Sequence, residues 1–357
     1  MADTLFQQDI LNTPRALQDT LAFLGGRPRE VASALLAGGA QRFVALGNGS
    51  SWYASAASVY LHNALAKPGG TSAWAAPTGD YALYPAPLSA ADALVGVSAS
   101  GEVVDLLDLF QSLRGHHQIV GITNAPESAL TKLVDHRLLM KAGPSLVPTA
   151  TKTFTTSILA LDLLWLGLLV EQGVSAAAGV KQELAAMPEA AERVTAEARG
   201  QVAEVADHLA GCSRLFVFGS GPAYPLAQEA ALVFKETASL PAEAVQAREM
   251  SHGIASVVDR TVGVIAINPP GRGEAAVQPV LADCRQLGAV TLNVGRAPAD
   301  LVVSASCPEL LSPLVYGAPL FLLANELAGR RGINTDQPAW YEEYMRASRR
   351  AAGAEKP

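Results

Sequence analysis

The stretch RFVALGNGSSWYASAASVYLHNAL, residues 42–65, decides the fold of this chain. It contains a short apolar run at 43–46, a turn of small residues at 47–51, and then an amphipathic segment with helical spacing. This order predicts a βα unit, in which a strand leads through a tight turn directly into a helix. Backbone N–H groups and hydroxyls gather at the start of such a helix and favour anions. The stretch therefore predicts an anion-binding turn.

Serines also follow the next predicted strand. A strand is predicted at 93–100, and its last three residues begin the turn SASGE, residues 98–102. A helix is predicted directly after this turn, at 103–113. Further strands are predicted at 117–126 and near 136–140. Because open α/β sheets bind ligands outside the carboxyl ends of their strands, we expect the two serine-bearing turns to meet at one crevice.

The same plan occurs twice in the chain. Residues 215–236, LFVFGSGPAYPLAQEAALVFKE, repeat the strand, Gly-x-Gly turn and helix of 43–63, and residues 261–281 and 288–295 correspond to 93–110 and 117–124. This internal duplication predicts an α/β fold of two tandem doubly wound parallel-sheet domains. We expect a helical arm at 1–30, a first domain at 31–200, a second at 201–339 and a tail at 340–357. The arm segment 6–24 is expected to be two helical pieces outside the core.

The two copies are expected to have different roles. In the second copy NPPG, residues 268–271, replaces the serine turn and has fewer hydroxyls and N–H donors, so the anion site is assigned to the first copy. The second copy contains a predicted helix with Lys235 and Glu236, followed by a loop with His252 beside Gly253. A carboxylate and a histidine suit proton transfer on a small molecule. Each is also compatible with an ordinary surface role, and Lys235 lies on a different helix face.

Composition excludes several classes of function. The chain has 357 residues, half of them hydrophobic, and a formal net charge of −7, which gives no broad field for nucleic acid or an anionic membrane. Its three cysteines are too widely spaced for a disulfide framework or a zinc site. The first ten residues lack the apolar core of a signal peptide, and the apolar run 158–170 is expected to be a buried helix. We therefore expect a cytoplasmic protein without a membrane span.

Nucleotide cofactors are not expected either. Neither the GNG turn nor the GSG turn extends to GxGxxG, no acidic residue ends the second strand, and no Walker A sequence occurs. The predicted proton-transfer chemistry needs no metal and no redox cofactor.

Several motifs, taken in order, resemble one known family. FQQDILNTP, GNGSS, SASGEVVD, TATKTFTT, EAALVFKE, AREMSHG and NTDQP extend over almost the whole chain. Together they resemble the double sugar-isomerase (SIS) domain family, with its flavodoxin-like domains. The family includes the isomerase half of glucosamine-6-phosphate synthase and stand-alone phosphosugar isomerases and deaminases. The sequence shows no N-terminal cysteine glutaminase domain, so a glutamine-using synthase is not expected.

The resemblance implies a role for each matching position. The phosphate of the substrate would be held by small residues of the two turns, with Gly101 giving backbone access: Gly49, Ser50, Ser51, Ser98 and Ser100. Ala150, Thr151 and Lys152 would border the sugar. Glu236 would be the base that moves a proton between C1 and C2. His252 would assist ring opening from the neighbouring subunit, which implies a homodimer with shared active sites.

This sequence also departs from the family pattern. Val103 offers no hydroxyl where a phosphate ligand is usual, Ala99 replaces a common polar residue, and Ala150 and Ser145 stand where a serine and a glutamate are frequent. Near the C-terminus Glu343 aligns approximately with the catalytic lysine of the family, and a glutamate cannot replace an amine chemically. The substrate could accordingly be an unusual sugar phosphate, or a sugar with another anion such as a sulfonate.

Three functions remain open at this point. The first is an aldose–ketose isomerase that acts through an enediol on an anionic, 6-phosphorylated sugar. The second is an amino-sugar phosphate deaminase or deglycase, against which the missing lysine counts. The third belongs to another class, a sugar-phosphate sensor without catalysis. The sequence does not identify the sugar, the direction of the reaction or the role of the C-terminal tail.

Overall fold

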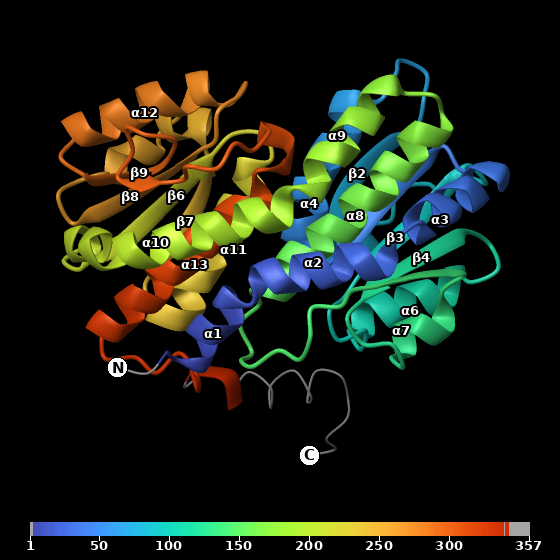
Figure 1. Cartoon of the computed structure of the whole chain (residues 1–357), viewed down its shortest axis with the longest axis horizontal. Helices are drawn as coiled ribbons and strands as arrows, with labels where there is room; N and C mark the ends of the chain where they lie inside the picture. The colour runs from blue at the N-terminus through green and yellow to red at the C-terminus, as the bar shows by residue number, and fades with distance from the viewer. Residues whose placement is uncertain (1–2, 339, 343–357) are drawn as a thin grey trace.

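The protein consists of two parallel five-stranded sheets with helices packed against them (Figure 1). This arrangement comes from a computed structural model, which describes residues 3–338 and 340–342. The strand order is β2-β1-β3-β4-β5 in the first sheet and β10-β9-β8-β6-β7 in the second. Read in reverse, the second order is the same doubly wound order as the first, with β6 in the place of β1 and β7 in the place of β2. The predicted fold of two tandem α/β units is confirmed.

The strands have the following bounds. Those of the first sheet are β1 (Arg42–Gly47), β2 (Ser72–Pro77), β3 (Asp92–Val97), β4 (Gln118–Thr123) and β5 (His136–Leu139). Those of the second are β6 (Arg214–Gly219), β7 (Ala242–Gln246), β8 (Val262–Asn268), β9 (Val290–Gly295) and β10 (Leu301–Val302).

Most of the helices lie in the segments that connect one strand to the next. Up to the middle of the chain they are α1 (Leu5–Leu11), α2 (Thr13–Leu24), α3 (Arg27–Ala37), α4 (Ser50–Leu65), α5 (Thr78–Leu83), α6 (Val104–Leu113), α7 (Ala129–Leu133) and α8 (Lys152–Glu171). They continue with α9 (Ser175–Ala185), α10 (Met187–Leu209), α11 (Ala223–Ala238), α12 (Glu274–Gln286) and α13 (Pro313–Arg330). The 3-10 turns are η1 (Ala247–Ser251), η2 (Ile254–Val257) and η3 (Glu309–Leu311).

Strand β1 shows why a continuous apolar run forms a central strand. Phe43 and Ala45 lie in the largest core cluster, whereas Val44 and Leu46 lie in a separate cluster on the other face. Because side chains alternate between the faces of a strand, both faces of β1 are buried under helices. The strand ends at Gly47, where a Cβ would meet the backbone carbon of Ser51 at 2.6 Å. Glycine therefore lets α4 begin directly after the strand.

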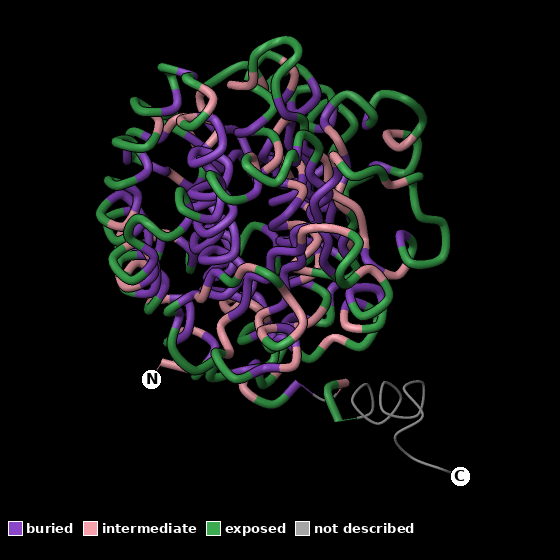
Figure 2. The backbone as a smooth tube through the Cα atoms, turned by 90° about the vertical axis from the view of Figure 1, so that its right-hand side faces the viewer, coloured by how far each residue is buried: buried purple, intermediate pink, exposed green. Residues whose placement is uncertain are grey.

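The N-terminal helices belong to the core, so the expectation of an arm outside it is wrong. Phe6 and Ile10 of α1 are 0% exposed, as is Leu17 of α2. These apolar side chains recur at helical spacing and turn inward against α8, α10 and α13. Figure 2 shows that buried residues lie in the interior of the whole molecule and that exposed residues lie on the outer helices and loops.

Helix α8 is the predicted buried helix. Among the described residues it alone is long and apolar enough to cross a membrane, and 94% of its most apolar window is buried inside the protein. Its contacts with α2, α3 and α4 account for this composition. The apolar run is therefore explained by packing within the core.

Candidate active site

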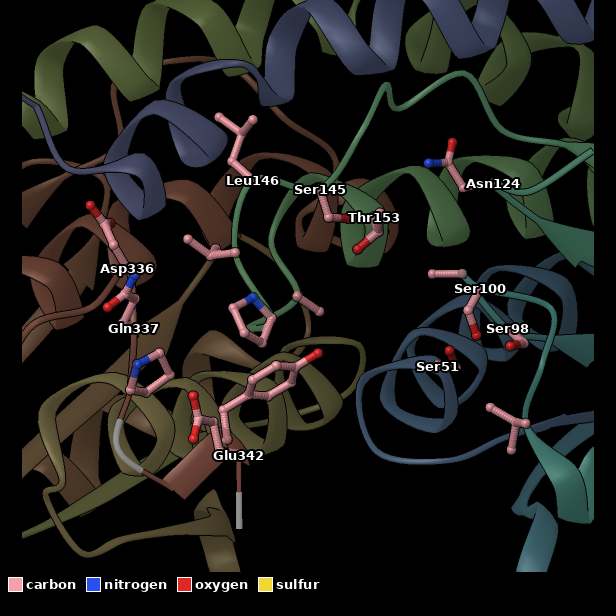
Figure 3. Close-up of a pocket in the computed structure, with 17 residues that line it drawn as sticks. Ser51, Ser98, Ser100, Asn124, Ser145, Leu146, Thr153, Asp336, Gln337 and Glu342 are labelled. Atoms are coloured by element: carbon pink, nitrogen blue, oxygen red, sulfur yellow. The ribbon is translucent and has the colours of Figure 1, made fainter. Parts of the chain in front are cut away.

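A cavity of about 950 Å³ lies at the carboxyl end of the first sheet. It is lined by residues from five separate segments: Ser51; Ser98, Ala99, Ser100 and Val103; Asn124; Ser145, Leu146, Val147, Pro148, Ala150 and Thr153; Asp336, Gln337, Pro338, Tyr341 and Glu342. Figure 3 shows Ser51, Ser98 and Ser100 together at one end and Asp336 and Glu342 at the other. The cavity therefore has a hydroxyl end and an acidic end.

Three helices begin at the cavity. Ser51 is the second residue of α4, Val103 is the N-cap of α6, and Thr153 is the second residue of α8. None of these helix starts has a side-chain cap hydrogen bond. Unpaired N–H groups and the helix dipole attract anions at such positions. The starts of α4 and α6, together with the serine hydroxyls, make the hydroxyl end suitable for a phosphate or a sulfonate, whereas Thr153 at the start of α8 lies beside Ser145 (Figure 3).

The turn after β3 is shaped by hydrogen bonds within it. The Ser98 hydroxyl accepts the Gly101 N–H at 3.0 Å, and the Ser100 hydroxyl accepts the Glu102 N–H at 3.3 Å. Gly101 has a φ of +67°, and a Cβ there would lie 2.2 Å from the Ser128 hydroxyl. Only glycine fits this position. Gly101 does not itself line the cavity, nor do Gly49 and Ser50, which precede Ser51 in the other turn.

Lys152 and Thr151 face away from the cavity, although the resemblance placed them beside the sugar. The Lys152 ammonium is buried, forms an ion pair with Asp9 and donates to the Pro144 carbonyl at 2.7 Å. The Thr151 hydroxyl donates to the other Asp9 oxygen at 2.7 Å. Since a buried charge requires a partner, Lys152 is held by Asp9. These two residues therefore position the loop that precedes α8. Ala150, which belongs to this loop, does line the cavity.

Glu236 lies on α11, next to the cavity wall and not in it. Burial raises its pKa, an effect that the nearby Thr149 hydroxyl and then the Lys235 charge partly offset. The Thr149 hydroxyl is buried and has no hydrogen-bond partner among the described residues, so it lies near Glu236 without a hydrogen bond of normal geometry to it. Both sequence neighbours of Thr149 line the cavity. Glu236 is therefore a carboxyl one residue layer from the ligand space.

Glu229 is a second carboxyl in this region, and no motif in the sequence indicates a role for it. It is 0% exposed, and neither of its oxygens has a hydrogen-bond partner among the described residues. Burial raises its pKa well above the usual range, and the charge of Glu236 raises it further, whereas the Ser50 hydroxyl lowers it. Glu229 and Glu236 are seven residues apart, so they share one face of α11. Only this spacing could have singled out Glu229 in the sequence.

The remaining candidates lie elsewhere. His252 is the exposed residue at the end of η1 and is not among the residues that line the cavity. Glu343 lies outside the described residues. Trp340 donates its indole N–H to the Glu236 carbonyl at 2.8 Å, which joins Trp340 to the end of α11. Asn124, Thr153, Asp336 and Gln337 line the cavity without having been predicted.

The chain is similar to proteins of known family. The SIS domain model matches residues 40–167 and 208–294, more than half of the chain. Glutamine–fructose-6-phosphate aminotransferase (isomerizing) of Gloeobacter violaceus is 32% identical over 335 residues, which cover 90% of this chain and 54% of that relative. The chain spans about half the length of the curated relatives it matches.

Solved structures show the same fold. The C-terminal domain of glucosamine-fructose-6-phosphate aminotransferase from Francisella tularensis superposes with a TM-score of 0.86 at 21% identity, covering 94% of this chain and 99% of that one. Glucosamine-6-phosphate deaminase from Thermotoga maritima superposes with a TM-score of 0.77 at 20% identity, covering 94% and 98%. The two matched segments begin just before β1 and β6. The chain therefore belongs to the SIS domain family and contains two such domains.

Proposed function

We propose that the protein is an aldose–ketose isomerase acting on an anionic, 6-phosphorylated sugar. The observation that carries this proposal is the cavity lined by three helix starts without side-chain caps and by Ser51, Ser98 and Ser100. Glu236, with its raised pKa, lies beside the wall of the same cavity. An anchored anion and a nearby carboxyl are what a proton shift along a sugar requires.

In the proposed reaction the Glu236 carboxylate, which lies behind the cavity wall in this structure, comes within hydrogen-bond reach of the bound sugar and removes the proton from C2 of the open-chain aldose. The electrons of that C–H bond form the C1=C2 bond of an enediol, and the C1 carbonyl oxygen takes up a proton. Glu236 then returns its proton to C1, while the C2 hydroxyl loses its proton and becomes the ketose carbonyl. Burial raises the pKa of Glu236 towards the working pH, which helps one group both to take and to return a proton.

The relatives support this reaction class. The Gloeobacter relative bears the words fructose-6-phosphate and isomerizing in its name, and this chain matches about half of it. The Thermotoga structure is named a deaminase, which motivates the second candidate, release of ammonia from an amino-sugar phosphate. Val103 borders the cavity without a hydroxyl, which keeps a sulfonated sugar among the substrates to be tested.

The first experiment is proton NMR in D2O with hexose, hexosamine and sulfonated hexose phosphates. We expect exchange at C1 or C2 with the wild type and a loss of about 10²- to 10⁴-fold in Glu236→Gln. Glu204→Gln, at an exposed position on α10, is the matched control and should keep full activity. Full activity in Glu236→Gln would contradict the mechanism, ammonia release would favour the deaminase, and binding without exchange would favour a sensor.

We also propose a homodimer that completes the site. His252 is exposed and outside the cavity lining, so the ring-opening histidine would come from a second copy. Mixed dimers of Glu236→Gln and His252→Ala should then recover about a quarter to a half of wild-type activity, whereas each homodimer stays inactive. A monomer at working concentration would contradict this.

A cytoplasmic location stays a proposal that cell fractionation would test.

A further inference from the structure

The second unit contains a counterpart of the anion turn of the first. Leu46 of β1 pairs with Gly96, and Phe218 of β6 pairs with Ala266, so the two sheets can be aligned residue by residue. This alignment places Gly271 at the position of Gly101. Both glycines have positive φ, +156° and +67° respectively. The turn after β8 thus retains the glycine of the turn after β3.

This second turn already holds an anion, the side chain of Glu309. One oxygen of its carboxylate accepts the Arg272 N–H at 2.8 Å, and the other accepts the Gly273 N–H at 2.6 Å. Gly273 is the N-cap of α12 and has no side chain that could cap the helix, and Arg272 directly precedes it. Two charge-assisted hydrogen bonds at a helix N-terminus are a favourable site for a carboxylate.

The glycines leave the space that this carboxylate occupies. A Cβ at Gly271 would lie 2.4 Å from one Glu309 oxygen, and a Cβ at Gly273 would lie 2.9 Å from the other. A Cβ at Gly221, in the turn after β6, would lie 3.9 Å from Glu309. Gly221 is the counterpart of Gly49. Glu309 therefore lies between the same two turns that carry Ser51 and Ser98 in the first unit.

The two units differ in what fills this position. In the first unit the serine hydroxyls face an open cavity, and the acidic residues of its lining lie at the opposite end (Figure 3). In the second unit the carboxylate arrives from η3, which is 36 residues along the chain from Gly273. The turn NPPG has fewer hydroxyls than the serine turn, but the backbone N–H groups of Arg272 and Gly273 directly after it still act as donors. The second turn keeps an anion site that the protein itself occupies.

We propose that Glu309 is a built-in anion in the second unit's copy of the anion site. Removing its carboxylate opens this site to a small tetrahedral oxyanion, with inorganic phosphate as the probe. In the wild type Glu309 fills the site of the second unit, so we expect the chain to bind one external anion, at the site of the first unit. This inference does not depend on the proposed isomerase reaction.

The test compares Glu309→Ala with Glu309→Gln in a chain that also carries Ser98→Ala and Ser100→Ala, which weaken the first site. Thermal unfolding is measured in phosphate and in chloride at equal ionic strength. We expect both variants to unfold at lower temperature in chloride. In about 50 mM phosphate, Glu309→Ala should recover roughly 2 to 5 °C. Glu309→Gln should not recover, because the amide still fills the space.

Isothermal titration with phosphate gives a second reading, since Glu309→Ala in the otherwise wild-type chain should bind one more anion than the wild type. Equal phosphate responses in Glu309→Ala and Glu309→Gln would overturn the proposal and leave Glu309 as a helix cap only. If Glu309→Ala does not fold in chloride, it is refolded in phosphate or sulfate. Recovery of the folded protein there supports the proposal, and failure in both anions overturns it.

Discussion

At the scale of single residues, the serines could be predicted and Glu229 could not. Ser51 and Ser98 follow apolar strands and precede helices, so local sequence alone indicates an anion turn. Glu229 resembles any helix glutamate in the sequence. Its burial depends on how α11 packs against α4, which no local pattern reveals. A site residue that owes its properties to tertiary packing is therefore missed by sequence reasoning.

The raised pKa of Glu229 predicts how stability depends on pH. Its folded-state pKa lies well above that of the unfolded chain, so the folded protein binds the proton more tightly. The contribution of Glu229 to stability is complete below the unfolded pKa and is lost as pH rises through the folded pKa. Glu229→Gln removes this proton linkage. The fall in unfolding free energy between about pH 5 and about pH 8 should be smaller in Glu229→Gln than in the wild type.

Urea unfolding monitored at several pH values would measure this difference. Glu204→Gln, at an exposed position, is the control and should follow the wild-type curve. The buried Asp162, whose pKa burial also raises well above its usual range, leaves part of the pH dependence in every variant. Identical slopes for Glu229→Gln and the wild type would show that Glu229 titrates alike in the folded and unfolded chain.

At the scale of elements, the strands with apolar runs were predicted, including the edge strand β5, whereas the edge strands β2, β7 and β10 were missed. β1, β3, β4 and β6 lie inside their sheets and overlap the predicted segments. β2 and β7 lie at sheet edges and consist largely of small residues, with the exposed Glu243 in β7, so no apolar run identifies them. Edge and near-edge strands can be half-buried, so their sequences resemble loops.

Helix α1 and the loop before α8 show another limit of sequence reasoning. Lys152 was assigned to the substrate because of the motif around it, but its partner Asp9 is 143 residues away. A contact between such distant positions follows from the fold and not from spacing. It also explains why the N-terminal helices lie in the core, since Asp9 is 1% exposed and hydrogen-bonds residues on both sides of the loop.

The Asp9–Lys152 pair should be important for stability and for the shape of the cavity. Asp9→Asn or Lys152→Met leaves one buried charge without its partner and should cost about 3–5 kcal/mol of unfolding free energy. The double variant should cost clearly less than the sum, because no charge is then stranded. Chemical denaturation of the four proteins measures this coupling. Sugar phosphate binding should weaken in each single variant, since residues 145–148 and 150 line the cavity.

The exposed pair Arg15–Asp19 on α2 provides the matched control. Asp19→Asn should change the unfolding free energy by less than about 1 kcal/mol, because exposed ion pairs contribute little. Strict additivity of Asp9→Asn and Lys152→Met would mean that the two charges do not stabilise each other.

At the scale of the whole molecule, the two units share one core. The largest buried cluster contains Phe43 of β1 together with Val217 of β6. Phe154 of α8 and Phe321 of α13 meet edge to face at 6.2 Å between ring centroids. Helices of the first unit also contact those of the second, as α4 does with α11. Sequence duplication predicted two domains, but it contained no information about how much core they share.

A shared core predicts that the two units unfold as one. Phe110 is fully buried in a cluster confined to the first unit, and Phe110→Ala should cost about 3–5 kcal/mol. Trp52, Trp74 and Trp165 all lie in the first unit, so tryptophan fluorescence reports mainly on it, whereas far-UV circular dichroism reports on both units. We expect the two signals to shift together in Phe110→Ala, with calorimetric and van't Hoff enthalpies equal. If the fluorescence transition moved alone and the second unit kept its wild-type midpoint, the units would be independent and the shared core would contribute little to cooperativity.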